Sequence, residues 1–464
     1  MWALAQRAVQ QGQQAGLAAV GIAPATPMDS TRRVLEERKR AGLSGGMQFT
    51  YRNPARSTDP SRALPGAAAL VVGAWPYGPE GRGHAGEGRL AARCRPAGGP
   101  RGPAGGRAGA GQGPKGAEGC GGATQLPLRP RGRVARYAWE DHYTGLRAAL
   151  GQVAGVLEAA GWRARVLVDD NALVDRAAAH RAGLGWFGKN SNILLPGRGS
   201  WFVLGSVATD APLPTGTPVA GTCGPCQHCL QACPTGALVA PGTLDARKCL
   251  AWLLQCPGVF PWEHREALGD RIYGCDDCQD VCPVNRLAAR RASTAGAGGP
   301  GASRPGPGRA TNGGTAGAGE LALGGEEPPD GSGARAGGRR EVDVLDLLAA
   351  SDQELLQGYG RWYIPRRDPR YLRRNALVVL GNTADGSSPA VESAVRAYLA
   401  HDDELLRAHA IWAAARLGRA DLVTSARPPL AWGPAPLVQE ELARLGQVRP
   451  ARAGVQGRAG GQGR

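Results

Sequence analysis

Two groups of cysteines in the middle of the chain have the spacing of iron–sulfur ligands. The first group is complete, because Cys223, Cys226, Cys229 and Cys233, followed by Pro234, form the pattern C-x₂-C-x₂-C-x₃-C-P. Bacterial ferredoxins bind two Fe₄S₄ clusters with two such runs. A bound cluster of this kind carries single electrons, so this segment predicts an electron-transfer site.

The second group lacks its first cysteine, because Ile272 stands at that position. In the two-cluster arrangement, three closely spaced cysteines hold one cluster and the fourth reaches the other. The ligands expected for cluster one are therefore Cys223, Cys226, Cys229 and Cys282, and those for cluster two are Cys233, Cys275 and Cys278. The fourth ligand of cluster two must be Cys249 or Cys256. Zinc is a weaker alternative, because a zinc site does not need two C-x₃-C-P signatures.

Composition divides the 464 residues into folded and unfolded stretches. Residues 78–130 and 291–340 are rich in glycine and have few large apolar side chains, so we expect a disordered insert and a disordered linker. The remainder has the length of two or three domains. Nine of the eleven cysteines lie between residues 223 and 282. Their spacing favours metal ligands in a reducing cytoplasm over disulfides.

The net charge of +16 suggests an anionic partner but does not identify it. No apolar run approaches the ~18–20 residues of a membrane span. The N-terminus also has no long hydrophobic block after a basic one, which argues against a secretory signal.

Short apolar runs in front of the cysteines predict a domain that mixes strands and helices. Residues 66–75 and 163–169 have the pattern of buried strands, and residues 141–161 that of a helix. A second helix is expected over 173–185, followed by a strand pair around a glycine turn over 192–209. The class is α/β or α+β, in which the first strands could be parallel.

Asp169 and Asp170 end one of these strands. Open α/β sheets place ligand sites at such ends, but an acidic residue there can equally cap the next helix. Both uses are possible, with Asp170 or Asn171 as cap and Asp169 facing a cavity. His180 has the position of a packed or surface histidine, and the glycines of 183–188 are too loosely spaced for a dinucleotide site.

The C-terminal part predicts helical hairpins with a basic edge. Residues 372–382 and 406–418 match at an offset of 34 residues, which suits HEAT-like repeats. Just before and within the first repeat are six arginines in fourteen residues, interleaved with Trp362, Tyr363 and Tyr371. This combination suits RNA phosphates and unstacked bases, although a solvated helix face would explain some of the charge. The six candidates for RNA contact are Arg361, Arg366, Arg367, Arg370, Arg373 and Arg374.

Residues 169–210, the two cysteine runs and the segment DARKC together closely resemble the epoxyqueuosine reductase family. The resemblance runs in order over most of 16–77, 132–287 and 341–418, and the glycine-rich stretches have no counterpart in it. It implies a cobalamin-dependent oxidoreductase with two [4Fe-4S] clusters that completes queuosine synthesis in tRNA. It also implies that the fourth ligand of cluster two is Cys249, which leaves Cys94, Cys120 and Cys256 without a ligand role.

The same resemblance assigns the proton donor to Asp169, in a motif that continues with Asp175 and Arg176. Three departures from the family's usual residues accompany it. Ala172 stands where proline is usual, His142-Tyr143-Thr144 where Asp-Tyr-His is common, and Ser206 where glutamate is frequent. The stretch His142-Tyr143-Thr144 lies near the expected substrate, so the way the enzyme binds its substrate could differ from that of the family.

Cobalamin contacts implied by the resemblance fall on Arg56, Ser57, Ala135, Asp169, Ile193, Leu204, Ala251, Cys278 and Gln279. The D-x-H-x-x-G pattern that supplies a histidine to cobalt in mutases is absent around His180. We therefore expect cobalamin without a protein histidine on the cobalt.

These observations predict reduction of epoxyqueuosine to queuosine at the tRNA wobble position by a monomeric cytoplasmic enzyme, with an external single-electron donor and no membrane partner. The expected domains are a cobalamin-binding catalytic domain over 1–215, a two-cluster ferredoxin-like domain over 216–290, the linker over 291–340, and a HEAT-like tRNA-binding domain over 341–450. One alternative is a dehalogenase-like reductase of a small molecule, which the basic helical tail disfavours. The other is a ferredoxin module on a helical adaptor, which leaves the N-terminal domain without a role.

Overall fold

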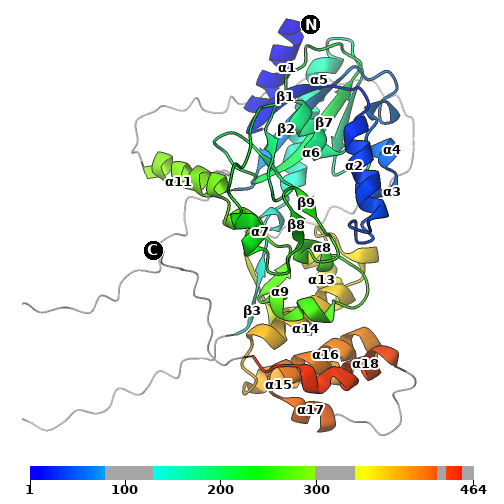
Figure 1. Cartoon of the computed structure of the whole chain (residues 1–464), viewed down its shortest axis with the longest axis vertical. Helices are drawn as coiled ribbons and strands as arrows, with labels where there is room; N and C mark the ends of the chain where they lie inside the picture. The colour runs from blue at the N-terminus through cyan, green and yellow to red at the C-terminus, as the bar shows by residue number, and fades with distance from the viewer. Residues whose placement is uncertain (79–128, 298–339, 426–434, 452–464) are drawn as a thin grey trace, which may run out of the picture. The chain divides into compact units, whose positions relative to one another are not determined.

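The computed structural model describes residues 1–78, 129–297, 340–425 and 435–451 (Figure 1). The predicted insert and linker, with Cys94 and Cys120, fall almost wholly outside these ranges. The linker was predicted to begin at residue 291, but helix α11 (Pro283–Ala297) continues through that point. The helix that follows Cys282 is therefore longer than the sequence indicated.

The N-terminal region is built on a four-stranded sheet with the order β1-β2-β7-β4. Its strands are β1 (Ala19–Pro24), β2 (Ala69–Pro76), β4 (Ala164–Val168) and β7 (Phe202–Thr209). Each neighbouring pair is antiparallel. The two strands predicted from the sequence, β2 and β4, are present but do not pair, because β7 lies between them. Because both strands are antiparallel to β7, they run in the same direction, as suggested, although they are not neighbours.

Helices cover both faces of this sheet. On one face α1 (Trp2–Gln14) and α5 (His142–Glu158) lie side by side, and on the other lies α6 (Asp175–Arg181) (Figure 1). Because side chains alternate along a strand, Val71 of β2 joins the first core, whereas Leu70 and Val72 join the second. Strand β2 is thus buried on both sides. Asp169 directly follows β4, the strand at one edge of this sheet.

The predicted hairpin over 192–209 was wrong. Its first half, β6 (Ile193–Leu194), pairs with β5 (Trp186–Phe187), whereas its second half is β7 of the main sheet. A single bridge between Leu195 and Gly199 closes the turn between them. The glycines thus make a turn between two sheets. The remaining short helices of this region are α2 (Asp29–Arg40), α3 (Phe49–Arg52) and α4 (Pro54–Ser57).

The cysteine-rich region consists of short elements joined by loops. They are α7 (His228–Ala232), β8 (Leu238–Ala240), β9 (Thr243–Leu244), α8 (Leu250–Leu253), α9 (Arg265–Leu268), β10 (Arg271–Tyr273) and α10 (Asp277–Asp280). Gly274 follows β10 with a φ of +72°, and a Cβ there would lie 2.5 Å from the Cβ of Ala135. A glycine is therefore required where the chain turns into the loop of Cys275.

The C-terminal region is helical. Its helices are α12 (Val344–Ala349), α13 (Asp352–Tyr359), α14 (Arg370–Thr383), α15 (Pro389–Leu399), α16 (Glu404–Arg416), α17 (Ala420–Ser425) and α18 (Pro436–Arg444). The starts of α14 and α16 are 34 residues apart, as the repeat predicted, and the two helices pack against each other. The segment from Val342 onward was expected to be helical, but Val342 and Asp343 instead belong to strand β11 (Glu341–Asp343).

The predicted domain boundaries cut through shared structure. Strand β3 (Arg131–Val134) pairs with β10 in parallel and with β11 in antiparallel orientation, so one small sheet joins three predicted domains. A single core likewise contains Val134, Phe260 and Trp412. The cysteine-rich and helical regions therefore stabilise each other by burying a common apolar surface. Within the described ranges, no helix is both long and apolar enough to cross a lipid bilayer.

Candidate active site

A cavity of about 630 Å³ lies where the sheet end, the cysteine loops and the start of the helical region meet. Its wall includes Asp169 after β4, Cys278 of α10 and Tyr363 ahead of α14. The volume is within the range of ligand and cofactor pockets. The structure thus brings together three predicted parts of the site that are far apart in sequence.

Asp169 follows β4 directly and has a φ of 52°, the left-handed region that few non-glycine residues adopt. Asp170 stabilises the turn, since its Oδ1 accepts a hydrogen bond from the backbone N–H of Ala172 at 2.9 Å. The Asp169 side chain is open to the cavity, yet the surrounding protein raises the pKa of its carboxyl by desolvation, against the opposing charge of Arg147. An aspartate in such a setting is suited to donate a proton.

A second carboxyl lines the same cavity. Asp175 lies in the first turn of α6, and burial, reinforced by the charge of Asp169, raises its pKa to about 8. Tyr143 interacts electrostatically with both carboxyls, and burial raises the pKa of its hydroxyl. These three side chains form an acidic cluster on one wall.

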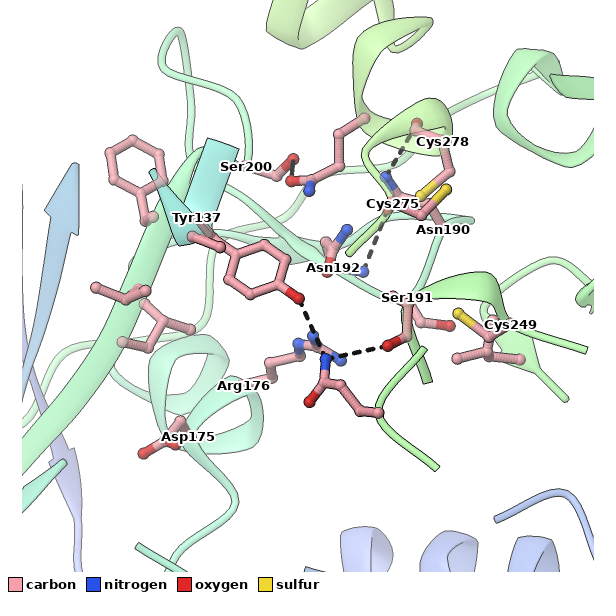
Figure 2. Close-up of a pocket in the computed structure, with 18 of the residues that line it drawn as sticks. Tyr137, Asp175, Arg176, Asn190, Ser191, Asn192, Ser200, Cys249, Cys275 and Cys278 are labelled. Atoms are coloured by element: carbon pink, nitrogen blue, oxygen red, sulfur yellow. Dashed lines mark hydrogen bonds between the residues drawn. The ribbon is translucent and has the colours of Figure 1, made fainter. Parts of the chain in front are cut away.

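The opposite wall carries cysteines. Figure 2 shows the sulfurs of Cys249, Cys275 and Cys278 on one side of the cavity, with the Tyr137 hydroxyl and the Arg176 guanidinium pointing into it from the other. Gln255 donates its side-chain N–H to the Tyr137 hydroxyl at 3.2 Å. Burial raises the pKa of Tyr137, so this hydroxyl stays protonated.

The cysteines gather in the two sets expected from the sequence. Burial raises the pKa of the Cys278 thiol well above its usual range, and neighbouring thiols raise it further. Those thiols are Cys275, Cys249, Cys233 and, last, Cys229. The first three are the other expected ligands of cluster two.

The second set surrounds Cys229. Burial raises the pKa of its thiol, followed by the effects of Cys223, Cys282 and Cys226. These are the other expected ligands of cluster one. Among the described residues, no three His, Cys, Asp or Glu side chains converge on a point where a single metal ion could bind.

Cys256 belongs to neither expected set, although the Cys249 thiol is near enough to affect it. Burial raises the pKa of its thiol to about 12, with smaller influences from Arg374 and Cys249. Cys249 itself is the N-cap residue of α8, where the backbone N–H groups of Trp252 and Ala251 lower its pKa against the larger effect of burial. Donors of this kind favour a thiolate, which supports Cys249 over Cys256 as the ligand.

Polar contacts hold the cysteine loops against the N-terminal region. Asn190 donates its side-chain N–H to the carbonyl of Cys278 at 3.4 Å, and Lys189 Nζ donates to the carbonyls of Gly224 and Cys226 at 2.7 and 2.9 Å. The Ser200 hydroxyl donates to Gln279 Oε1 at 2.9 Å. The cavity wall is therefore fixed by contacts from both regions.

Six of the nine residues expected near cobalamin line this cavity, namely Asp169, Ile193, Leu204, Ala251, Cys278 and Gln279. Arg56, Ser57 and Ala135 do not. Ser57 is buried behind the wall, and its hydroxyl donates to the carbonyl of Thr50, a lining residue. The lining drawn from the described ranges contains no histidine.

Comparison with known proteins agrees with this architecture. Residues 222–285 match the family model described as a 4Fe-4S double cluster binding domain, and this range holds all eight expected ligands. The epoxyqueuosine reductase of Xanthomonas campestris pv. campestris is 35% identical over 293 residues, which are 62% of this chain and 71% of that protein. The enzyme of Shewanella oneidensis is 34% identical over 314 residues, 66% of this chain and 70% of its own.

The chain belongs to the epoxyqueuosine reductase family. A crystal structure of an epoxyqueuosine reductase with a tRNA-Tyr epoxyqueuosine-modified stem loop has the same fold, with a TM-score of 0.69 and 25% identity over 96% of this chain and 98% of that one. The Streptococcus thermophilus structure gives 0.67 at 22% identity, covering 95% and 97%. The predicted relationship is confirmed.

The residues that differ from the family's usual ones lie at three places in the structure. Tyr143 lines the cavity, whereas the hydroxyl and backbone N–H of Thr144 bind the Asp141 carboxylate at the start of α5. Ala172 is buried. Ser206 is buried in β7, and its hydroxyl has no hydrogen-bond partner among the residues that the structure describes. Tyr143 matches the family's usual tyrosine, and none of the departing residues His142, Thr144, Ala172 and Ser206 is in the cavity lining.

Two of the six arginines expected to bind RNA are structural. Arg374 is fully buried and donates to the carbonyls of Cys256 and Gly258, both at 2.7 Å. Arg373 is mostly buried against Asp352 and the carbonyl of Ala350. The sequence could not separate these arginines from the others, because charge density does not show which face of α14 is packed.

The remaining four arginines reach the surface. Arg361 lines the cavity and donates to the carbonyl of Trp139 at 2.7 Å, and Arg370 pairs with Asp368 and, at 3.4 Å, with Asp403. Arg366 and Arg367 are exposed and have φ values of 54° and 52°. Of the interleaved aromatic residues, Trp362 and Tyr371 are buried and only Tyr363 is exposed.

Several cavity residues were missed from the sequence. Tyr77, Tyr137, Asn190 and Ser191 carried no recognisable signal, because they lie in loops whose paths depend on tertiary packing. Asp175 and Arg176 stood in a motif but were given no role. Charged residues are common in the first turn of a helix, so the sequence alone did not mark this pair as functional. Their position in the cavity lining does.

Proposed function

We propose that this protein reduces epoxyqueuosine to queuosine in tRNA, as its family membership indicates. The observation that carries the proposal is the single cavity that unites a carboxyl of raised pKa with the cysteines expected to bind cluster two. A reduction that removes oxygen needs electrons and protons at one place. The cavity is the described site where both can meet.

The cysteine sets fit two [4Fe-4S] clusters, and the wall of Ile193, Leu204 and Ala251 fits a cobalamin. When bound, these groups supply the two electrons of the reaction, received singly from an external donor. Lys189 and Asn190 hold the cysteine loops in register with the cavity. Because thiolate ligands survive in a reducing compartment, we expect the enzyme to work in the cytoplasm. We also expect it to be a monomer.

Asp169 is the proposed proton donor to the departing oxygen. Desolvation raises the pKa of its carboxyl, so a larger share is protonated near neutral pH than for an exposed aspartate. Its left-handed backbone is the kind of local strain that often accompanies functional positions.

The tRNA is proposed to bind along the cavity mouth and the start of the helical region. Arg361, Arg366, Arg367 and Arg370 supply the positive charge there, and exposed Tyr363 offers a face on which a base can stack. The strained pair at Arg366 and Arg367 supports a role beyond solvation. The HEAT-like hairpins behind them would act as a rigid support.

Anaerobic reconstitution tests the proposal. Protein supplied with iron, sulfide and cobalamin should show cluster and corrin absorption together, and should convert an epoxyqueuosine-bearing tRNA stem loop to a product lacking one oxygen atom. Corrin and iron binding with reduction of a small organohalide instead of the tRNA would point to the dehalogenase-like alternative. Iron without corrin would favour an electron-transfer adaptor.

A further inference from the structure

The proposed reaction needs more protons than one carboxyl holds. Removing an epoxide oxygen as water breaks two C–O bonds, forms one C=C bond, and consumes two electrons and two protons. Asp169 can give one proton and is then a carboxylate. Within the cavity, a second proton must therefore come from another group or from solvent.

Most other ionisable groups of the wall are unsuited to supply it. Burial raises the pKa of Tyr77, Tyr137 and Tyr273, so their hydroxyls release protons reluctantly. Asp141 accepts hydrogen bonds from Thr144, and Asp277 is paired with Arg271. Each of these carboxylates already serves as an acceptor.

Asp175 differs from them in position and in partners. It lines the cavity from the first turn of α6, on the side away from the cysteine sulfurs (Figure 2). It is close enough to Asp169 for the two charges to affect each other, and Tyr143 interacts with both. The two carboxyls and the Tyr143 hydroxyl therefore lie around one cavity, within electrostatic range of one another.

We propose that Asp175 is the proton reserve of the site, which restores to Asp169 the proton that Asp169 gives to the substrate. This inference rests on the proposed function. The Asp169 carboxyl protonates the epoxide oxygen as the first C–O bond breaks. Asp175 then passes its proton to the Asp169 carboxylate, directly or through the Tyr143 hydroxyl. Asp169 protonates the same oxygen again as the second C–O bond breaks and water leaves.

The electrostatics of Asp175 agree with this role. Burial and the negative charges of Asp169 and Asp170 favour its neutral form, and the adjacent Arg176 opposes them. With a pKa of about 8, Asp175 carries its proton at pH 7 and is more acidic than the buried tyrosines. Because the protonated form is the active one, turnover should be retained below pH 8 and lost as the pH rises through it.

The experiment compares reconstituted wild-type protein with Asp175→Asn and Asp175→Glu, using the modified stem loop from pH 6 to pH 9. Asp175→Asn should lower turnover at pH 7 by about 10²-fold, the lower range for a positioned acid. In this variant, the pH at which turnover falls on the alkaline side should also move away from pH 8. Stem-loop affinity and the cluster spectrum should stay as in wild type. Asp175→Glu should restore turnover with a displaced limb, since its carboxyl sits differently.

Asp170→Asn is the matched control: Asn can still accept the hydrogen bond from Ala172, so turnover at pH 7 should stay near wild type, and loss of the Asp170 charge should move the alkaline fall in turnover only slightly, to lower pH. An active wild type with an Asp175→Asn variant of equal rate and profile overturns the proton reserve alone. The proton reserve is also overturned if turnover falls at the same alkaline pH in wild type and Asp175→Glu. This comparison remains available if the Asn variant does not fold. A wild type that leaves the epoxide intact overturns the proposed function and this inference with it.

Discussion

Asp169 is exposed, the pKa of its carboxyl is raised, and its backbone has a left-handed conformation. We predict that Asp169→Asn lowers turnover by about 10²–10⁴-fold, the usual contribution of a general acid. Asn keeps the size and the hydrogen bonding but has no proton to donate. Stem-loop binding and cluster reduction should be retained, and both can be measured in the same samples. Loss of corrin from the variant would instead make Asp169 a binding residue.

Cys249 and Cys256 differ in their neighbours, although both follow the first cysteine run. The thiol of Cys249 is close to Cys233 and Cys278, whereas that of Cys256 is influenced mainly by burial and Arg374. Cys249→Ala should therefore lower iron content by about half through loss of cluster two, with cluster one kept. Cys256→Ala should lose no iron. Equal losses in both variants, measured by iron content and electron paramagnetic resonance, would contradict the ligand set.

The cysteines of the two runs were recognised from their local spacing, whereas the choice of Cys249 over Cys256 came from the family resemblance, and the elements around the cysteines depend on distant contacts. The helix at 141–161 was found from the periodicity of its apolar face, and the strands at 66–75 and 163–169 were found as short apolar runs bounded by glycine or charged residues. The pairing of β7 between β2 and β4 could not be found, because nothing in the local sequence states which strand a given strand will join. The false hairpin has the same cause.

The turn before α14 carries the clearest exposed charge of the helical region. Replacing Arg366 and Arg367 by Gln should weaken stem-loop binding most at low salt. It should reduce the slope of log affinity against log salt by roughly 0.7–0.9 for each phosphate that the variant no longer neutralises. Arg396→Gln is the control, because Arg396 is an exposed arginine of α15 paired with Glu392. Equal slopes in all three proteins, measured by titration of labelled stem loop, would place the RNA elsewhere.

The helical region does more than present charge, since it shares a core with the cysteine-rich region. Arg374 of α14 is fully buried and donates to the carbonyls of Leu253 and Leu254 at 3.1 and 3.3 Å, besides those of Cys256 and Gly258. These carbonyls end α8 and the turn after it, directly downstream of Cys249. A residue of the predicted RNA-binding tail thus holds the segment that carries a cluster ligand. This is why the sequence divided the chain into more independent domains than the structure contains.

Arg374→Met should therefore reduce both stability and cluster retention. Burial lowers the pKa of Arg374 to about 10, so it remains charged at neutral pH and binds the four carbonyls as a cation. Methionine fills much of the space but donates nothing, and each buried carbonyl left without a partner costs about 1–3 kcal/mol. We expect a loss of about 3 kcal/mol or more in the free energy of unfolding, and faster release of iron from cluster two than from cluster one. Arg370→Met, on the same helix with exposed ion pairs, should change stability by less than about 1 kcal/mol. Thermal unfolding and iron release measured side by side would decide the matter. An Arg374→Met protein that keeps its melting temperature and its iron would show that the apolar core and the remaining hydrogen bonds, such as that from Asn375 to the Leu254 carbonyl, hold α14 to the cysteine loops without Arg374.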